Sequence, residues 1–534
     1  MMGFGKNLGK NNPLEKRKRR DLSSGLEQNQ EAAGAYTQQK DSENQKSTPG
    51  KKTLQKQNEN AQENPPSQKR IPQTISDCQE LVQSTFFHSS DLVTQVFDTK
   101  LGKILIVYID GLLNKDLLNR DVVTPLKSDS FDGNIPNCIK TPFTTANDFD
   151  SCVSSITNSN ILVFYENSGI AYIVDIKAWD KRSVEQPDAE SVIRGPKEGF
   201  TECLRTNTSL IRRKIKNPAL VFEDLQLGRQ TNTTISLVYI HGIVNRRILK
   251  DIKEQLSKID IDAVLESGYI EDFLDPNKFS PVSSIGLTQK PDVAASKILE
   301  GRVGILCDGT PHVLTIPELF IENIHTSEDY YARIPGASVL RALRLIGLFI
   351  GILLPGLSVA IFTFHQEMIQ SSFLSHLILS TQKTPLPVSL EAFFLILMFE
   401  LLREAGTRLP KTVGSAITIV GSLIIGEAAV NAGIVGAPMV IIIALTAVAS
   451  FIVPNLSEFI MLYRYFFLFL GSVMGLVGIG AGVMILLTQL ASTESFGVPI
   501  LSIKSLKDSI VRFPFQSMKY RPRSIAKDNV RRVK

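Results

Sequence analysis

The stretch LIGLFIGILLPGLSVAIFTF at residues 345–364 decides the fold class, because it carries no formal charge over its whole length. Arg341 and Arg344 precede it, and the next charged residue is Glu367. A bilayer hydrocarbon core of about 30 Å needs about 20 apolar helical residues to cross it. Backbone groups inside a bilayer have to bond internally, so the stretch is predicted to be a membrane helix.

Further apolar segments follow along the chain. With the first, they cover residues 341–364, 389–402, 412–434, 436–461 and 465–490. Four are long enough to span, whereas 389–402 is short and carries Glu391 and Glu400. This short segment is expected either to face a bundle interior or to lie at the membrane interface. The sequence therefore predicts an all-α polytopic membrane domain at 336–492 with four to five apolar helices.

Charge is distributed unevenly along the chain. Residues 1–75 carry a net charge of +6 and residues 501–534 a net charge of +8, although the whole chain is only +5. Basic ends beside membrane segments are typical of contact with an anionic cytoplasmic leaflet. Binding of nucleic acid is not expected, since the leader offers only Phe4 and Tyr36 as stacking platforms.

Residues 1–75 form a polar, basic leader rich in Lys, Gln, Asn, Glu and Ser. Such a segment has too little apolar surface to offset the entropy of ordering, so it is predicted to be disordered. The segment 493–534 is predicted to be a basic cytoplasmic tail. Five crossings would place that tail outside, so we expect four crossings, with the soluble domain and both termini cytoplasmic.

Residues 76–335 read as a soluble α/β domain made of two subdomains, 76–200 and 201–335. YIDGLLNKDLL (108–118) is similar to YIHGIVNRRIL (239–249), and a hairpin pattern at 161–173 is matched by one at 302–314. The two offsets, about 131 and 141 residues, suggest related topologies. Because the match is short, chance similarity between strand–turn–helix units is the alternative.

The soluble part shows no catalytic pattern. GPKEGF (195–200) lacks the spacing of a phosphate-binding loop, and CDGTPH (307–312) places Cys, Asp and His on a predicted hairpin turn. The five cysteines are scattered and indicate reduced structural thiols. We therefore predict no enzyme activity, no cofactor and no metal site.

Polar residues within the apolar region are the candidate functional residues. Glu427 lies in an otherwise uncharged stretch, and Asn431 follows one helical turn later on the same face. Intramembrane ionisable groups usually mark functional paths or helix contacts. The predicted pore or gating residues are Glu400, Arg403, Glu404, Glu427 and Asn431. Glycines at small-xxx-small spacing are the predicted helix-packing positions: Gly347, Gly351, Gly471 and Gly475.

Several blocks resemble one family. The matching segments are GPKEGFTE (195–202), NTSLIRRKIKNPALVFED (207–224), KPDVAASKILEGRVGILCDGTPHVLTIP (290–317), ELLREAGTRLPKTVGSAITIVGSLIIGEAAVNAGIVGAP (400–438) and RFPFQSMKYRPR (512–523). They are similar to the spore germinant receptor A subunits of the GerA family over about residues 80–525. Two features depart from the family pattern: the long leader, and Glu427 where that pattern often has Gln.

The resemblance implies a component of the inner membrane of a bacterial spore. It implies a permease-like B subunit and a lipoprotein C subunit as partners. It also implies a homo-oligomer of A subunits, suspected to be a pentamer, that forms or gates a cation channel and triggers germination. A secondary transporter subunit and a membrane-tethered enzyme are the rival functions. No inverted repeat was found for the first, and no clustered titratable site for the second.

Overall fold

The computed structural model describes residues 70–128, 131, 133–177, 190, 192–278, 280–382, 384–408, 426–501, 508–522, 524–526 and 531–532. The predicted leader lies outside these ranges up to residue 69, and the predicted span 412–434 is described only from residue 426. Both expectations therefore stay predictions.

The first sheet follows α2 (Ile75–Thr85) in the chain. Its strands are β1 (Leu92–Thr99), β2 (Gly102–Ile109), β3 (Phe143–Ala146), β4 (Ile161–Tyr165) and β5 (Ala171–Val174). Their order across the sheet is β1-β2-β4-β5-β3, and all neighbours are antiparallel. The helical segments are α3 (Lys115–Leu118), a π-helical turn (Asn119–Val123), α4 (Thr124–Lys127), α5 (Ile135–Cys138) and α6 (Phe149–Thr157).

Successive residues of β2 point to opposite faces, which places a hydrophobic core on each side of this sheet. Leu105 and Val107 pack with residues of α2 and α6, whereas Ile104 and Ile106 pack with residues of α4 and α5. A strand buried on both faces is almost uniformly apolar, as ILIVYI (104–109) is. This is why the sequence identifies it so clearly.

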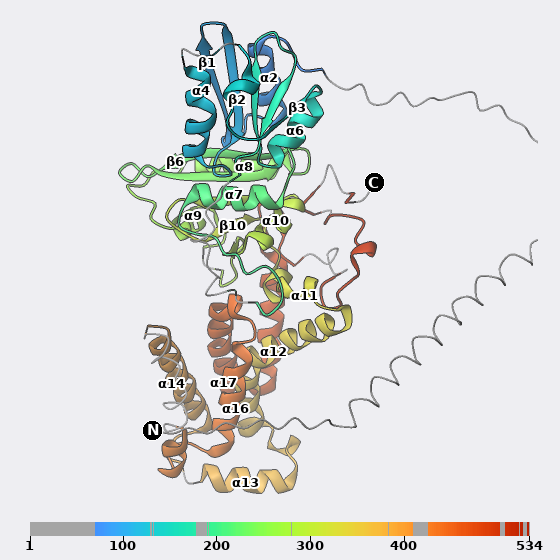
Figure 1. The fold of residues 1–534 in the computed structure, drawn as a ribbon. Helices are drawn as coiled ribbons and strands as arrows, with labels where there is room; N and C mark the ends of the chain where they lie inside the picture. Colours follow the sequence, from blue (N-terminus) through green and yellow to red (C-terminus); the bar gives the residue numbers. More distant parts are fainter. Residues whose placement is uncertain are drawn as a thin grey trace, which may run out of the picture. The chain divides into compact units, whose positions relative to one another are not determined.

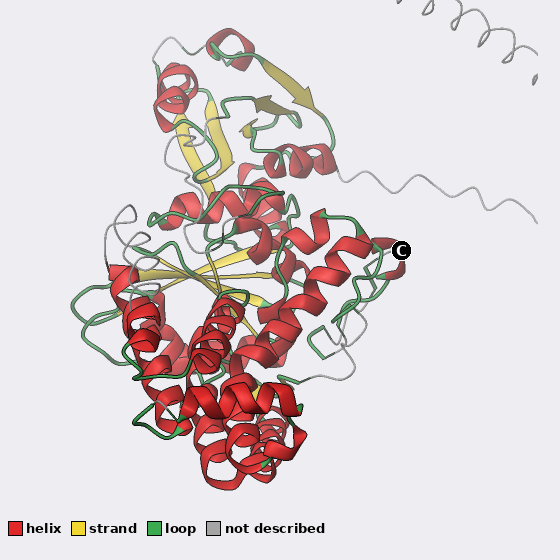
Figure 2. Ribbon diagram, turned by 90° about the horizontal axis from the view of Figure 1, so that it is seen from below, coloured by secondary structure: helices red, strands yellow, loops and turns green. Residues whose placement is uncertain are grey.

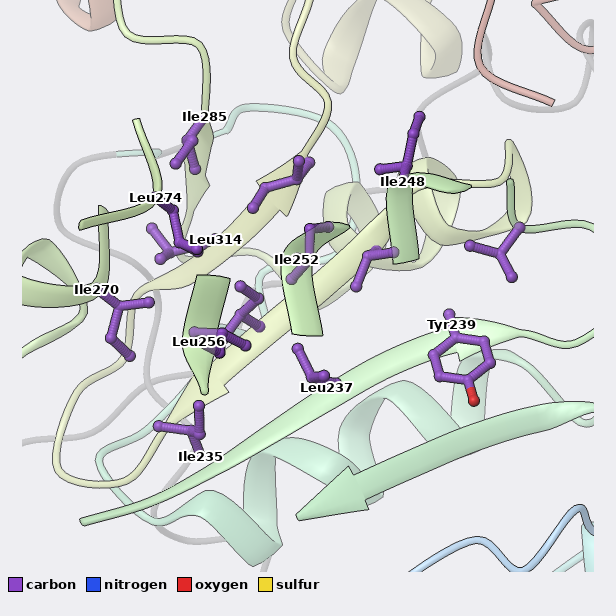
Figure 3. Packing of buried hydrophobic residues seen from close by; sticks show 14 of the residues in the cluster. Ile235, Leu237, Tyr239, Ile248, Ile252, Leu256, Ile270, Leu274, Ile285 and Leu314 are labelled. Carbon is purple, nitrogen blue, oxygen red and sulfur yellow. The ribbon is translucent and has the colours of Figure 1, made fainter. Parts of the chain in front are cut away.

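The second sheet has the same strand order. Its strands are β6 (Leu220–Leu227), β7 (Thr233–Ile240), β8 (Gly286–Thr288), β9 (Val303–Cys307) and β10 (Val313–Ile316), in the order β6-β7-β9-β10-β8. Its helices are α7 (Leu204–Lys214), α8 (Arg246–Leu256), α9 (Ser267–Leu274) and α10 (Pro291–Leu299). Figure 3 shows Leu237 and Tyr239 of β7 facing Ile252 and Leu256 of α8. Residues of α7 and α10 line the core on the other face.

The similar segments YIDG and YIHG occupy the same place in the two sheets, at the end of the second strand. Gly111 and Gly242 have φ angles of 81° and 83°, a conformation that favours glycine. Three residues after each glycine, an asparagine accepts hydrogen bonds from the first turn of the next helix: Asn114 caps α3 and Asn245 caps α8. The local similarity therefore comes from one strand–turn–cap geometry used twice.

The remainder of the described chain is mainly helical, and Figure 2 draws the helices of the molecule in red. Its elements are a 3-10 turn (Phe320–Ile324), α11 (Glu328–Tyr331), α12 (Ile334–Phe364), a second 3-10 turn (Gln366–Met368), α13 (Ser371–Thr381), α14 (Val388–Arg408), helical residues 426–431, α16 (Ala437–Ser450), a third 3-10 turn (Pro454–Leu456) and α17 (Ser457–Ser492). Short strands β11 (Glu494–Ser495) and β12 (Val498–Pro499) and a 3-10 turn (Phe515–Ser517) follow. Figure 1 labels the main helices. Two described stretches, Ile334–Phe364 and Pro454–Ser492, are long and apolar enough to cross a membrane by length and composition.

The helix boundaries differ from the predicted segments in two places. The segment predicted at 389–402 is part of a longer helix, α14, because the charged residues that follow continue its helical pairing through Arg408. The segment predicted at 436–461 is not one helix: α16 ends at Ser450, and α17 begins after the turn at Pro454. Proline removes a backbone donor and restricts the residue before it, which accounts for the break.

The segment predicted as one helix at 465–490 folds back on itself. Gly475 has φ 59° and ψ −143°, which interrupts the helical geometry of α17. The Tyr463 hydroxyl donates to Oε1 of Gln489, and a Cβ on Gly482 would lie 2.7 Å from the ring of Phe467. In one straight helix, Tyr463 and Gln489 would be about 39 Å apart. The two limbs, 457–474 and 476–492, therefore form an antiparallel helical hairpin.

Both ends of the helical region contact the second sheet's part of the chain. Beyond α17, the Ser495 hydroxyl donates to the Ser284 carbonyl oxygen at 2.6 Å, and the Phe320 amide donates to the Ile500 carbonyl oxygen at 3.2 Å. At the start of α12, Arg341 reaches the carbonyl oxygen of Asp508 at 2.7 Å. The chain thus enters and leaves the helical region at the same end.

Candidate functional site

A buried ionic cluster joins three helices at the predicted position Glu400. Nη1 of Arg464 donates to Oε1 of Glu400 at 2.9 Å, and Nη2 of Arg403 lies 2.7 Å from Oε2. Nε of Arg464 also donates to the carbonyl oxygen of Gly351 at 2.9 Å. The cluster therefore connects α12, α14 and α17 through one arginine.

The charges in this cluster are paired within the protein, and the predicted pore or gating role of Glu400 and Arg403 stays a prediction. The Arg464 side chain is 2% exposed and that of Glu400 10%. Each oxygen of Glu400 faces an arginine nitrogen, so the carboxylate is compensated inside the protein. Glu400 and Arg403 are brought together as predicted candidates, and the sequence analysis missed Arg464. The signal in the sequence that could have identified Arg464 is a basic residue within an apolar stretch longer than one membrane span.

Glu404 is placed differently, on the exposed face of α14. It pairs with Arg408 one turn later, and both side chains are largely exposed. Such an i,i+4 pair is screened and contributes little. Glu404 is therefore separate from the buried cluster around Glu400.

Glu427 and Asn431 lie in the helical residues 426–431, and both are exposed. The spacing of four residues places them on one face, as the sequence predicts. The structure does not bring them together with Glu400. Their role on an ion path stays a prediction.

A second acidic residue of α14, Glu391, is buried, although the sequence analysis did not rank it as a candidate. Its Oε2 accepts from the backbone amide of Gly436 at 3.3 Å, at the N-terminus of α16. A helix N-terminus favours a carboxylate, because its amides are unpaired and its dipole is positive there. Beside Glu391 lies a cavity of about 10 Å³, enough for one water molecule. Phe362, Leu377 and Met439 contribute to its lining.

The predicted packing glycines lie at close helix contacts. A Cβ on Gly347 would lie 3.1 Å from Ile452, and one on Gly351 would lie 3.3 Å from Ile460. A Cβ on Gly471 would lie 2.4 Å from the carbonyl oxygen of Gly356, a position that the sequence analysis missed. The predicted pairs each join two glycines four residues apart. Gly356, which follows Pro355 within α12, has no glycine at that spacing and was therefore not identified.

A polar cluster marks the boundary between the α/β part and α12. Arg341 and Arg344 both donate to the buried carboxylate of Asp329, at 3.0 and 2.8 Å. Burial by itself would raise the pKa of Asp329, but the two arginines and the Thr326 amide lower it below its usual value. The Tyr330 hydroxyl donates to Asp508 at 2.8 Å, which brings the tail into the same cluster.

The described basic residues of the tail mostly bind protein groups. Arg512 donates to the carbonyl oxygens of Ala332 and Tyr330, Arg521 donates to that of Leu299, and Arg532 pairs with Glu300. Lys519, by contrast, is exposed. The tail is thus partly built into the protein, rather than being only a charged segment facing lipid.

The motifs of the soluble part have structural contacts. Oδ1 of Asp308 accepts from the Leu204 amide and so caps α7. Burial raises the pKa of the Cys307 thiol to about 12. Glu198 of the GPKEGF segment pairs with Arg213 and Lys214. Within the described ranges, no group of three His, Cys, Asp or Glu side chains is placed to hold a metal ion.

Comparison with known proteins gives a consistent result. The model of the Bacillus/Clostridium GerA spore germination protein family matches residues 80–524. Spore germination protein KA of Bacillus subtilis (strain 168) is 39% identical over 468 residues, covering 84% of this chain and 86% of that protein. Spore germination protein B1 of the same strain is 34% identical over 472 residues, covering 85% and 97%. The uncharacterized membrane protein YfkQ, also of this strain, is 38% identical over 456 residues, covering 82% and 89%.

The chain is also similar to a solved structure. It is the crystal structure of the N-terminal domain of the A subunit of the Bacillus megaterium spore germinant receptor GerK3. The match is 29% identical and covers 48% of this chain and 99% of that one, with a TM-score of 0.38. The sequence matches over most of the chain carry the family assignment.

Proposed function

The chain belongs to the Bacillus/Clostridium GerA spore germination protein family, and from that premise we propose that it is the A subunit of a nutrient germinant receptor in the spore inner membrane. The observation that carries this proposal is the similarity to spore germination proteins across both the sheet-containing and the helical parts. The expected partners are a permease-like B subunit and a lipoprotein C subunit. Further copies of this chain, in a suspected pentamer, complete the proposed complex.

Deletion of the gene in its sporulating host tests this assignment. Spores that lack the chain are expected to lose the response to at least one nutrient, measured by release of dipicolinic acid, and to regain it on complementation. Membrane fractions of the parental spores are expected to contain the protein by immunoblot. Normal germination of the deletion strain with every nutrient that germinates the parent would contradict the proposal.

The arrangement of the described helices supports a multi-pass topology with both ends on the cytosolic side. Glu391 at the start of α14 lies beside Gly436 and Phe362, whereas Glu400 lies near Gly351. Thus α14 runs opposite to α12, and α16 begins where α14 begins. Arg408 and Gly436 then belong to opposite ends of the bundle. With the two limbs of α17, the chain enters and leaves the helical region at the same end, which corresponds to an even number of passages.

We further propose that Glu427 and Asn431 face a cation path in the assembled receptor. Both are exposed polar residues within an apolar part of the chain, and a ring of like subunits multiplies each acidic residue. Glu400 and Arg403 have a different proposed role, since Arg464 joins them in a buried cluster that holds three helices together.

Potassium release from spores carrying Glu427→Gln or Glu427→Ala tests this path. Slower release after nutrient addition is expected for both, with the alanine variant the more impaired, because it loses all polar ligand atoms at the position. Glu404→Gln is the matched control, as an exposed acidic residue already paired with Arg408. Release at the parental rate by both Glu427 variants, at normal protein abundance, would remove Glu427 from the path.

A further inference from the structure

Residues Asp508–Phe515, here called the strap, lie along the first turns of α12. The Arg512 amide donates to the Ser338 hydroxyl at 3.1 Å, and its guanidinium donates to the Ala332 carbonyl oxygen at 2.7 Å. Arg341 binds both the carbonyl oxygen and the carboxylate of Asp508. The Phe513 amide donates to the Asp508 carboxylate at 2.9 Å. The strap is therefore fixed to α12 by its polar groups.

Apolar side chains of the strap stay exposed beside these bonds, and the Phe515 ring also lies 5.4 Å from the Arg512 guanidinium. Ile510, Val511, Phe513 and Phe515 are all exposed, with Val511 at 57% and Phe515 at 58%. Four exposed large apolar side chains in eight residues exceed the scattered exposure of an ordinary surface. The first turns of α12 also expose Val339, Leu340 and Leu343.

The strap stands at a definite level relative to the charge-free run of α12. That run, residues 345–364, is about 30 Å long as a helix and matches a bilayer core. Ser338 and Arg341, which bind the strap, precede Leu345 by about 10 and 6 Å along the helix. The polar headgroup layer adds about 5–7 Å on each side of the core. If α12 crosses the bilayer, Arg341 therefore lies level with the headgroups and Ser338 just beyond them, which places the strap at the membrane surface.

We propose that the strap is a membrane-interface anchor, whose apolar side chains insert at the headgroup–acyl boundary of the cytosolic leaflet. This rests on the proposed membrane location of α12. Aromatic side chains are favoured at that boundary, and the segment 509–522 contains no acidic residue. Its charge thus suits an anionic leaflet. The anchor fixes the end of the chain, the start of α12 and the lipid surface to one another.

Fluorescence quenching by lipids with brominated acyl chains tests the anchor in the full chain. The chain has one tryptophan, Trp179, so Trp179→Phe gives a silent background. Single tryptophans are then placed as Phe515→Trp in the strap, Phe349→Trp in the charge-free run and Phe273→Trp on α9. Phe349 and Phe273 are exposed as well, which makes them matched controls. The proteins are reconstituted into phosphatidylcholine–phosphatidylglycerol vesicles with and without bromine.

Brominated lipid is expected to reduce the fluorescence of the tryptophans at 515 and 349 and to leave that at 273 unchanged. Loss of fluorescence at position 349 alone would contradict the anchor proposal but would agree with the membrane location of α12. No loss at 349 would instead contradict that location. If Phe515→Trp lowers the thermal unfolding temperature, Phe513→Trp gives the same readout. Cross-linking of Phe515→Cys between copies, without quenching at 515, would show a second copy as the occupant and overturn the proposal.

Discussion

Glu400 lies between Arg464 and Arg403, so one buried carboxylate contacts two arginines. Removing one partner of a buried ion pair leaves an uncompensated charge, at a typical cost of about 3–5 kcal/mol. Exposed pairs such as Glu404–Arg408 contribute only about 0–1 kcal/mol. The contribution of a charged residue to stability therefore depends on its burial and its partners, and not on its presence in an apolar stretch.

Glu400→Gln is therefore expected to destabilise the full chain by about 3–5 kcal/mol, in thermal or denaturant unfolding in detergent. Arg464→Met is expected to be milder, because Glu400 keeps Arg403. The double variant is expected to be more stable than Glu400→Gln alone, since the uncompensated arginine is gone. Glu404→Gln on the same helix is the control, and an equal effect of the two glutamine substitutions would contradict the buried-pair argument.

The cysteines divide by burial. Desolvation raises the pKa of Cys78 to about 11 and those of Cys152 and Cys307 to about 12, which keeps these thiols protonated at neutral pH. Cys203 is exposed. Because the thiolate is the nucleophile, a maleimide at pH 7.5 is expected to modify Cys203 first and to spare the three buried thiols until denaturant is added. Peptide mass spectrometry identifies the modified cysteines. Early modification of Cys152 in folded protein would contradict the burial of its helix, α6.

At the residue level, the sequence indicated the Glu400–Arg403 neighbourhood because both residues lie on one helix. It did not indicate Arg464, since the pairing joins residues 64 positions apart and depends on how the helices cross. Glu391 was missed for the same reason: its partner is a backbone amide of another helix. Contacts made by chain folding leave no local pattern.

At the scale of elements, the strands were easier to predict than the ends of the membrane helices. β2 and β7 stand out as short apolar runs closed by a glycine turn, and the structure confirms strands there. Hydropathy finds apolar runs but not reversals within them. The hairpin of α17 is uniformly apolar through Gly475, so its two limbs read as one segment.

Gly475 is expected to determine this hairpin. Its φ of 59° costs a non-glycine residue about 1–2 kcal/mol, and a Cβ there would also lie 3.1 Å from Phe364 and His365. Gly475→Ala should therefore lower stability, whereas Gly480→Ala, with no atom within 4 Å of its Cβ, should not. Thermal unfolding in detergent gives the comparison.

Chemical cross-linking tests the geometry of the hairpin directly. The ends of the Tyr463 and Gln489 side chains are hydrogen-bonded, so cysteines at these two positions are expected to be joined within one chain by a short bis-maleimide, in a chain without other cysteines. Gly475→Ala should slow this cross-linking. Failure of the pair to cross-link in Gly475-containing protein would contradict the hairpin.

For the whole molecule, the sheets and the tail constrain the topology more strongly than charge does. The positive-inside rule favoured an even number of crossings because of the basic tail. The contacts of Ser495 and Asp508 with residues at the entrance of the helical region provide an independent geometric reason. Four crossings are predicted by counting apolar segments, a count that includes neither the reversal at Gly475 nor the direction of α14 opposite to α12.

The predicted four crossings and the helix contacts in the structure place the turn between α16 and α17 at opposite ends of the helical region. With four crossings and 389–402 embedded, residues 462–464 would follow an outward passage and face the exterior. In the structure, Gly347 near the start of α12 packs against Ile452, so the adjacent turn belongs to the end of the helical region at which the chain enters. Asn455 in this turn is exposed and suits a cysteine probe.

In right-side-out vesicles, a membrane-impermeant maleimide is expected to label Ser375→Cys on α13 from outside, in a chain without other cysteines. Asn455→Cys and Ser524→Cys should be labelled only after permeabilisation, because the structure joins both regions to the end that carries the sheets. Labelling of Asn455→Cys from outside would restore the four-crossing arrangement. Labelling of Ser524→Cys from outside would contradict any even number of crossings, because the start of α12 and the tail would then lie on opposite sides.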